Sequence, residues 1–437
     1  MKLRTKRFFV VALLAVAAAA LVIVSHPLSA GPATATNIIL LIGDGMGFEQ
    51  MRAGSYYIGT NLVFESWARQ GEVTTRSANS PITDSAASGT AMATGHKVNN
   101  GVVSLAIPGD GSEYETVLEF LKRRGKLTGL VTTTAITHAT PAVFAAHEDN
   151  RNNIAGIAAD YLNVSRPNVL LGGGSGFSAA EAAAAGYTVV TNRTELQSLN
   201  TASETMVSGQ FGNGHMPYEL DGTGDLPHLS EMTQTALEVL QSGTNGFFLM
   251  VEGGRIDHAC HANDIARCVR EVQEFDNAVK AALTWAGNRS DTLIIVTADH
   301  ETGGLAVQAD NGPGNEPDVT WSSPGHTGTN VGIFAVGPGS EAVGGAIDNT
   351  DVYRIMMLSQ PVPPAARAIE NGNDGQVRTK WDARPSAVCR LESSGDMLGT
   401  NWLHVMTVTA STHVVTLIDT NLPAEPTRFY RLVASGP

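Results

Sequence analysis

The stretch from Phe247 to Ala262 reads FFLMVEGGRIDHACHA and shows how this chain is organised. It begins with an apolar run of the length and composition of a buried strand, and the carboxylate of Glu252 follows that run directly. Asp257, His258 and His261 come within the next nine residues. Carboxylates and imidazoles at this density are typical of a zinc site. The stretch therefore predicts a buried strand that ends at a metal site.

Similar apolar runs occur elsewhere in the chain, and helix-like segments separate them. The runs are 37–42, 127–136, 246–251, 292–296 and 331–336, and the helix-like segments are 114–124, 229–241 and 268–285. This alternation predicts an α/β domain with a large, mostly parallel sheet that helices flank on both faces. The runs lack polar–apolar alternation, which fits strands that are buried on both faces. We expect all five to be parallel strands.

Ligand-type residues follow several of these strands. They are Asp44 after the first run, His138 and Thr140 after the second, Glu252 and Asp257 after the third, and Asp299 and His300 after the fourth. Because open α/β sheets place their sites at the carboxyl ends of strands, we expect these side chains to meet.

Composition limits the possible partners. The chain has 437 residues and a formal net charge of −14, which becomes −18 when the four basic residues of the N-terminal leader are removed. Such a charge argues against nucleic acid or an anionic membrane surface as a partner. It allows a small anionic substrate, since bound divalent cations would reverse the local sign.

The first 30 residues have the features of a signal peptide. A basic segment to Arg7 precedes an apolar run from Phe8 to Val24, and small residues cluster at 29–30 and 33–35. We expect cleavage after Ala30 or Ala35, export to the periplasm or the extracellular space, and no stable membrane partner afterwards. An uncleaved anchor helix is the alternative.

The three cysteines exclude a disulfide-dense scaffold. One bridge is possible in an exported protein, and one thiol must then remain. Cys260 stands between ligand-type residues, but we expect it to be no ligand.

The C-terminal part of the chain differs in character. The segment QPVPP begins a predicted linker at 360–375, and short alternating runs at 413–418 and 428–433 predict a small β-rich module over 376–437. The module has no cluster of ligand-type residues, so we expect the site to lie within 36–359.

A run of small residues, DSAASGTAMATG at 84–95, surrounds Ser85. A serine after aspartate can simply begin a helix. A nucleophile at that position would also benefit from the helix dipole and free N–H groups, which favour a bound phosphate.

Together these motifs resemble the alkaline phosphatase family from about residue 36 to about residue 359. The matching stretches, in the order found in the family, are NIILLIGDGMG at 37–47, the segment 84–95, HATP at 138–141, VEG at 251–253, IDH at 256–258, TADH at 297–300 and HTG at 326–328. The resemblance implies an alkaline phosphatase-like fold and hydrolysis of small phosphate monoesters. It also makes a homodimer possible.

The resemblance implies a role for each matching residue. Ser85 would become a phosphoserine, and Arg151 would bind the phosphate. One zinc ion would be held by Asp257, His261 and His326. A second zinc ion would be held by Asp44, Asp299 and His300. A magnesium ion would be held by Asp44, Thr140 and Glu252. His138 would bind that third metal directly or through water. His138 and His258 stand where the family varies, which leaves the metal preference of the third site and the pH optimum open.

Other functions fit parts of the pattern. A phosphodiesterase or phosphomutase of the same superfamily is the nearest, but those proteins typically lack the third-metal set that Thr140 and Glu252 complete here. A secreted metal-binding or adhesion protein without catalysis is a second alternative. A sulfatase is a third, although no residue matches the modified nucleophile motif of that family.

Overall fold

A computed structural model of the protein describes residues 20–21, 34–360, 365–371, 376–383, 387–394, 402–411, 414–420 and 429–435. The chain divides into two compact units, one formed by Ala30–Pro361 and the other by Val362–Pro437 together with Met1–Ser29. The predicted signal peptide lies outside the described residues, apart from the short strand β1 (Ala20–Leu21). No helix in the described parts of the chain is long and apolar enough to cross a membrane.

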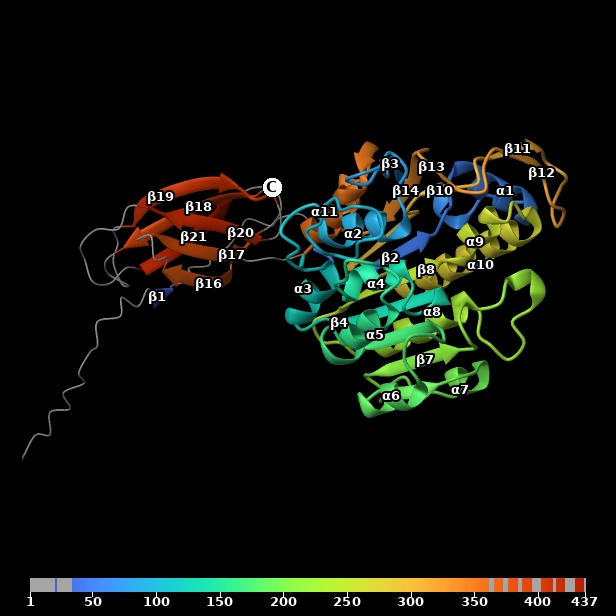
Figure 1. Ribbon diagram of the computed structural model, residues 1–437, viewed down its shortest axis with the longest axis horizontal. Coiled ribbons are helices and arrows are strands. Elements are labelled where there is room, and N and C mark those ends of the chain that lie inside the picture. The colour runs from blue at the N-terminus through green and yellow to red at the C-terminus, as the bar shows by residue number, and fades with distance from the viewer. Residues whose placement is uncertain are drawn as a thin grey trace, which may run out of the picture. The chain divides into compact units, whose positions relative to one another are not determined.

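The larger unit is built on one sheet of ten strands (Figure 1). Their order is β15 (Gly345–Asp348), β3 (Arg69–Thr74), β14 (Val331–Val336), β9 (Thr292–Thr297), β2 (Asn37–Gly43), β8 (Phe247–Gly253), β4 (Leu127–Ala135), β5 (Val169–Gly173), β7 (Val207–Phe211) and β6 (Thr188–Val190). From β9 to β6 each strand is parallel to the next one in this order, and β15 is parallel to β3. The predicted mostly parallel sheet is confirmed.

One predicted strand direction is wrong. The run 331–336 forms β14, which is antiparallel to both β9 and β3. The reason lies in the segment between β9 and β14. That segment includes β10 (Glu301–Thr302) and β13 (His326–Thr327), which pair antiparallel just beyond the carboxyl end of β9. The chain therefore re-enters the sheet at the edge where β9 leaves it, and β14 must run in the opposite direction.

The helices of the larger unit form two packed groups. One group is α1 (Phe48–Ile58), α8 (Leu229–Leu240), α9 (Arg255–His261) and α10 (Ile265–Ala286). The other is α2 (Ser85–Thr94), α3 (Val117–Arg123), α4 (Ala139–Ala145), α5 (Ile154–Asn163) and α11 (Asn349–Leu358). Because every residue of β2, β8 and β9 is buried, the two groups cover both faces of the central sheet. The three predicted helices correspond to α3, α8 and α10.

Shorter elements complete this unit: η1 (Val63–Ser66), α6 (Ala179–Ala184), α7 (Arg193–Gln197), η2 (Glu219–Asp221), β11 (Leu305–Ala309), β12 (Asp318–Trp321) and η3 (Ser340–Ala342). The core includes all of β2, whose residues are buried throughout. Ile38 to Ile42 are completely buried there, and each such side chain contributes about 1.5–3 kcal/mol. The rigid centre of the sheet therefore supports the strand ends that carry the site.

The smaller unit contains two β-sheets. One consists of β16 (Ala365–Asn371), β17 (Val377–Asp382) and β20 (Val414–Asp419), and the other of β1, β21 (Phe429–Ser435), β18 (Val388–Ser394) and β19 (Leu403–Thr409). Trp381, Leu391, Leu417 and Tyr430 pack into a shared core. The predicted linker at 360–375 is wrong over 365–371, since that segment forms β16 and pairs with β17.

Candidate metal centre

The site lies at the carboxyl edge of the three central strands. In the sheet register, Ile42 of β2 lies beside Glu252 of β8 and Thr297 of β9. The chain segments that leave these strands therefore begin at the same height, which brings Asp44 and Asp299 next to Glu252. All three carboxylates are completely buried. Buried carboxylates this close need either protons or cations, because desolvation and mutual repulsion both disfavour their charges.

Asp257, His261 and His326 form the first group of ligand-type side chains. Asp257 and His261 lie one turn apart on α9, and His326 comes from β13. The Nε2 atoms of the two histidines lie 3.1 Å apart, at 3.3 Å and 3.5 Å from the two carboxylate oxygens of Asp257. Each histidine donates a hydrogen bond from Nδ1 to a backbone carbonyl, that of Pro324 or Thr83. Without a metal ion, the hydrogen bond to Asp257 raises the pKa of His261 to about 9. When both Nε2 atoms are deprotonated, their lone pairs face the carboxylate, as metal ligands require.

Asp44, Asp299 and His300 form the second group and are completely buried. His300 Nε2 lies 3.1 Å from Asp299 Oδ2 and 3.5 Å from Asp44 Oδ1. The other oxygen of Asp299 accepts backbone hydrogen bonds from Gly45 and His300, which fixes the orientation of the carboxylate. Burial and the neighbouring carboxylates raise the pKa of Asp44 well above its usual value.

A third group combines Asp44 with His138 and Glu252. Within the part of the chain that the structure describes, several polar atoms here have no hydrogen-bond partner: both carboxylate oxygens of Asp44, Glu252 Oε1, Thr140 Oγ1 and His138 Nδ1. Burial raises the pKa of Glu252 to about 7. Unpartnered buried oxygens are costly in a folded protein, and a divalent cation would satisfy them. The donor set of all three groups fits bound metal ions.

Ser85 and Arg151 lie beside the second and third groups. Ser85 is the first residue of α2, and Asp84 caps that helix by accepting a hydrogen bond from the Ala87 amide. The Ser85 hydroxyl lies 3.3 Å from His300 Nε2. Arg151 donates hydrogen bonds to Asp84 and to His138 Nε2, at 3.0 Å and 3.3 Å. The structure therefore brings together all the site residues named from the sequence, and their chemical roles remain predictions.

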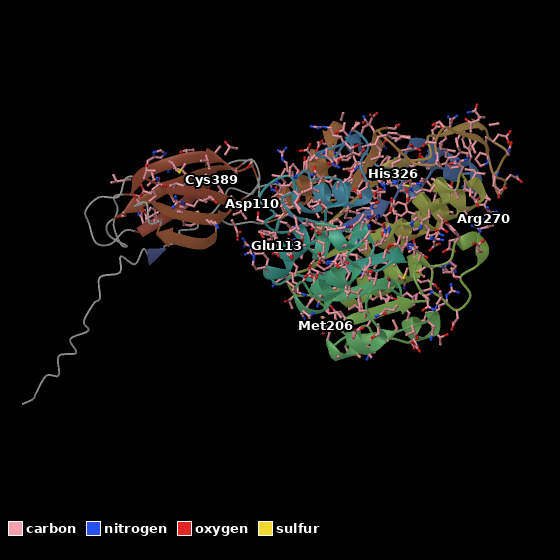
Figure 2. The ribbon with its side chains drawn as sticks, in the orientation of Figure 1. Asp110, Glu113, Met206, Arg270, His326 and Cys389 are labelled. Carbon is pink, nitrogen blue, oxygen red and sulfur yellow. The ribbon has the colours of Figure 1, made fainter. Side chains whose placement is uncertain are left out.

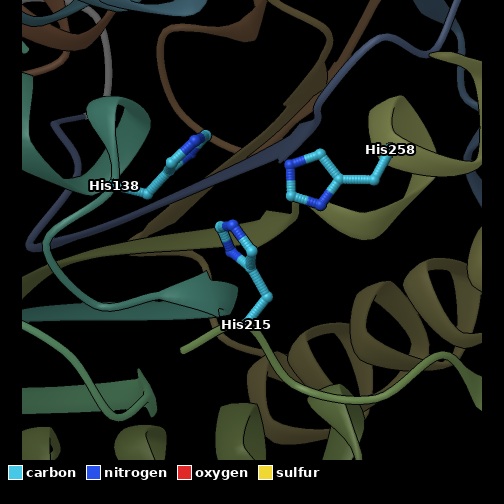
Figure 3. A group of neighbouring side chains, drawn as sticks. All are labelled: His138, His215 and His258. Atoms are coloured by element: carbon cyan, nitrogen blue, oxygen red, sulfur yellow. The ribbon is translucent and has the colours of Figure 1, made fainter. Parts of the chain in front are cut away.

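His215 belongs to the same region, and sequence reasoning missed it. Figure 3 shows its ring converging with those of His138 and His258. The ring centroids of these two residues lie 5.3 Å and 4.5 Å from that of His215. It follows β7 after a glycine-rich turn. The position of a histidine just beyond a strand end was thus the signal that could have revealed it.

The hydrogen bonds of His215 and His258 argue against metal binding by this triad. The backbone amide of Ala135 donates to His215 Nδ1, and the guanidinium of Arg255 donates to His258 Nδ1. In the neutral state both rings therefore carry their proton on Nε2, and they face the space between them as donors. Burial lowers the pKa of His258 to about 4, so neutral is its expected state. These two histidines are suited to bind acceptor oxygens.

The family of the chain follows from comparison with known proteins. Residues 35–317 match the family model described as alkaline phosphatase. The chain is 34% identical to Alkaline phosphatase 3 of Bacillus subtilis strain 168, over 73% of this chain and 87% of that protein. The chain therefore belongs to the alkaline phosphatase family, and it is an enzyme of the phosphatase class.

Two solved structures have the same fold as most of this chain. A cold-active alkaline phosphatase from a psychrophilic Shewanella species is 31% identical, with a TM-score of 0.68 over 74% of this chain and 100% of that one. A TAB5 alkaline phosphatase with one histidine replaced by aspartate is 30% identical, with a TM-score of 0.68 over 75% and 99%. That structure has Mg bound in its M3 site.

Proposed function

We propose that this protein is an exported, metal-dependent alkaline phosphatase that hydrolyses small phosphate monoesters through a phosphoserine at Ser85. The observation that supports this most is the position of Ser85, which combines a helix N-terminus, a nearby arginine and two groups of metal-type ligands. The carboxylates, imidazoles and arginine around it would bind and orient a phosphate dianion.

The three groups would hold three ions. One zinc would bind Asp257, His261 and His326, and a second would bind Asp44, Asp299 and His300. A magnesium would bind Asp44, Thr140 and Glu252, with His138 close enough to contribute a ligand. Bound there, such ions would supply positive charge for the phosphate oxygens and lower the pKa of the Ser85 hydroxyl.

The residues of the chain would act in two steps. Ser85 Oγ would form a bond to phosphorus as the ester oxygen leaves, and water would then break the Ser85–phosphate bond to release inorganic phosphate. Arg151 would hold two non-bridging oxygens through the fork of its guanidinium. The free N–H groups at the start of α2 would point toward the same phosphate. His215 and His258 would donate hydrogen bonds to oxygens or waters at the rim.

The decisive experiment measures turnover of an aryl phosphate monoester and of the matching diester, together with the metal content of the purified protein. We expect zinc and magnesium in the protein, a strong preference for the monoester, and loss of activity on exhaustive chelation that zinc and magnesium restore. A preference for the diester would favour a phosphodiesterase. Activity that survives chelation would exclude the metal mechanism.

Export and domain division need separate tests. N-terminal sequencing of protein recovered outside the cytoplasm should give a chain that begins after Ala30 or Ala35, and a chain that keeps its first residues would point to an anchor. We also propose that the C-terminal module, which includes β16 and therefore begins before the predicted residue 376, is separate from the catalytic domain 36–359. Removal of the module should therefore leave monoester turnover largely unchanged. Size-exclusion chromatography would show whether the enzyme is a homodimer.

A further inference from the structure

Two of the three cysteines lie in contact beside the first group of ligands. Cys260 is on α9, Cys268 is on the first turns of α10, and their Sγ atoms are 3.6 Å apart. Both side chains are completely buried. Cys389 lies on β18 of the other compact unit (Figure 2). Of the three thiols, Cys260 and Cys268 are the pair that the structure shows in contact.

The turn between the two helices keeps the two thiols in this arrangement. Asp264 caps α10 by accepting a hydrogen bond from the Arg267 amide, and its own amide donates to the carbonyl of Ala259. Asn263 adopts a left-handed conformation with φ +52°, and its amide donates to the carbonyl of Cys260. The backbone of the turn is thus fixed by hydrogen bonds, so the cysteines approach each other without help from a ligand.

The position of Cys260 connects this contact to the metal centre. Cys260 lies on the same short helix as Asp257 and His261, and the helix has only seven residues. Of the described residues, the groups that could hold a metal include no cysteine. The Sγ atom of Cys260 instead contacts that of Cys268 at 3.6 Å, and both side chains are completely buried. The buried contact is therefore better explained by a bond between the two sulfurs than by a metal ion that both would bind.

We propose that Cys260 and Cys268 form a disulfide during folding, and that this bond ties α9 to α10 and holds Asp257 and His261 in place for zinc. The reaction is thiol–disulfide exchange with a small disulfide or a disulfide-bearing oxidase. One cysteine thiolate attacks the oxidant and expels one of its thiols, and the second cysteine then displaces the other. Two cysteine thiols lose two protons and two electrons, and the oxidant's disulfide becomes two thiols.

The burial of both sulfurs predicts when this happens. A folded, reduced protein presents neither thiol to solvent, so exchange with an external oxidant should be slow. An unfolded chain exposes both. We expect refolding in a glutathione and glutathione disulfide buffer to give the bridge, whereas adding the same buffer to folded, reduced protein should give it many-fold more slowly.

The test measures the covalent state first and the zinc site second. The refolded protein is denatured, alkylated, digested and weighed. The expected result is a Cys260–Cys268 cross-linked peptide, lighter than the sum of the reduced peptides by two hydrogen atoms, with Cys389 alkylated. Three alkylated cysteines, or a bridge to Cys389, would overturn the proposal. These outcomes do not depend on enzyme activity or on the compartment in which the protein is found.

The second measurement is the rate at which zinc passes from the protein to a chromogenic chelator. Oxidised protein should lose zinc several-fold more slowly than reduced protein. The variant Cys268→Ala should release zinc at the reduced rate under both conditions, and Cys389→Ala should behave like the original protein. Equal rates for the oxidised and reduced protein would show that the bond does not hold the zinc ligands, and would overturn that part of the proposal.

Discussion

The guanidinium of Arg151 lies 3.0 Å from the carboxylate of Asp84, the residue directly before Ser85. Asp84 also caps α2, since its other oxygen accepts a hydrogen bond from the Ala87 amide. One carboxylate thus fixes both the helix that begins with Ser85 and the arginine that we propose binds phosphate. Both side chains of the pair are about one-fifth exposed, so solvent screens the attraction only in part.

Replacing Asp84 with asparagine should separate these two roles. Asparagine caps helices about as well as aspartate, but it removes the charge that attracts Arg151. We expect KM for an aryl phosphate and the inhibition constant of inorganic phosphate to rise by the same factor, roughly 3- to 30-fold, with little loss of helix stability. Steady-state kinetics with phosphate inhibition checks this. Asp291→Asn, in an exposed pair with Arg289, is the matched control and should leave both constants unchanged.

Replacing Ser85 with alanine should remove most turnover. Without the hydroxyl no phosphoserine forms, and we expect kcat to fall by about a thousandfold or more. Zinc content should stay the same, because the metal-type ligands come from other residues. Ser88→Ala, a change of the same size on the same buried helix, should keep most turnover. An S85A variant with normal kcat would mean that another group attacks phosphorus.

Replacing Glu252 with glutamine should affect the metal-free and metal-bound states in opposite ways. Glu252 is completely buried, and among the described residues its Oε1 has no hydrogen-bond partner. In a chelating buffer we expect E252Q to be as stable as the original protein or more stable, by about 1–3 kcal/mol, because a buried charge is removed. Magnesium should stabilise the original protein and not the variant.

Thermal unfolding with and without magnesium measures this difference. The control is Glu271→Gln, which changes another buried carboxylate, one that accepts a hydrogen bond from the Glu219 amide outside the three ligand groups. Its response to magnesium should equal that of the original protein. If E252Q gains as much from magnesium as the original protein does, Glu252 is not a ligand of the third ion.

The partly buried pair of His147 and Glu119 predicts a pH-dependent stability. His147 Nε2 lies 2.9 Å from the Glu119 carboxylate, and its Nδ1 donates to the carbonyl of Ser104. Burial alone would lower the pKa of His147, but Glu119 outweighs it and raises the pKa to about 9. A raised pKa in the folded state stabilises the protein fully below the unfolded value of about 6.5. That stabilisation is lost as the pH rises through about 9.

Urea unfolding of the original protein and of His147→Gln, in one buffer series from about pH 6 to about pH 9.5, tests this. The advantage of the original protein should shrink by up to about 3 kcal/mol across the series, since each pKa unit corresponds to about 1.4 kcal/mol. Comparing the two proteins cancels titrations that they share. A constant difference across the series would mean that His147 is neutral throughout.

Much of the fold could be predicted from local pattern. The apolar runs and the helix-like segments could be located because burial on both faces and a period of 3.6 residues leave strong traces in sequence. The direction of β14 could not be predicted, since it depends on where the segment after β9 returns to the sheet. The strand at 365–371 could not be predicted either. The neighbouring prolines indicate a linker, and the strand depends on pairing with β17.

The sequence by itself determined the kinds of ligand and the strand ends that carry them, because residue type fixes donor chemistry and a run of apolar residues fixes a strand. Only the tertiary structure decided which of these residues meet. The pairing of β13 with β10 brings His326 next to Asp257. The turn after β7 brings the ring of His215 next to that of His258. It also decided the tautomers, since the proton on an imidazole depends on the partner of its other nitrogen. That partner is set by folding, as the amide of Ala135 shows for His215.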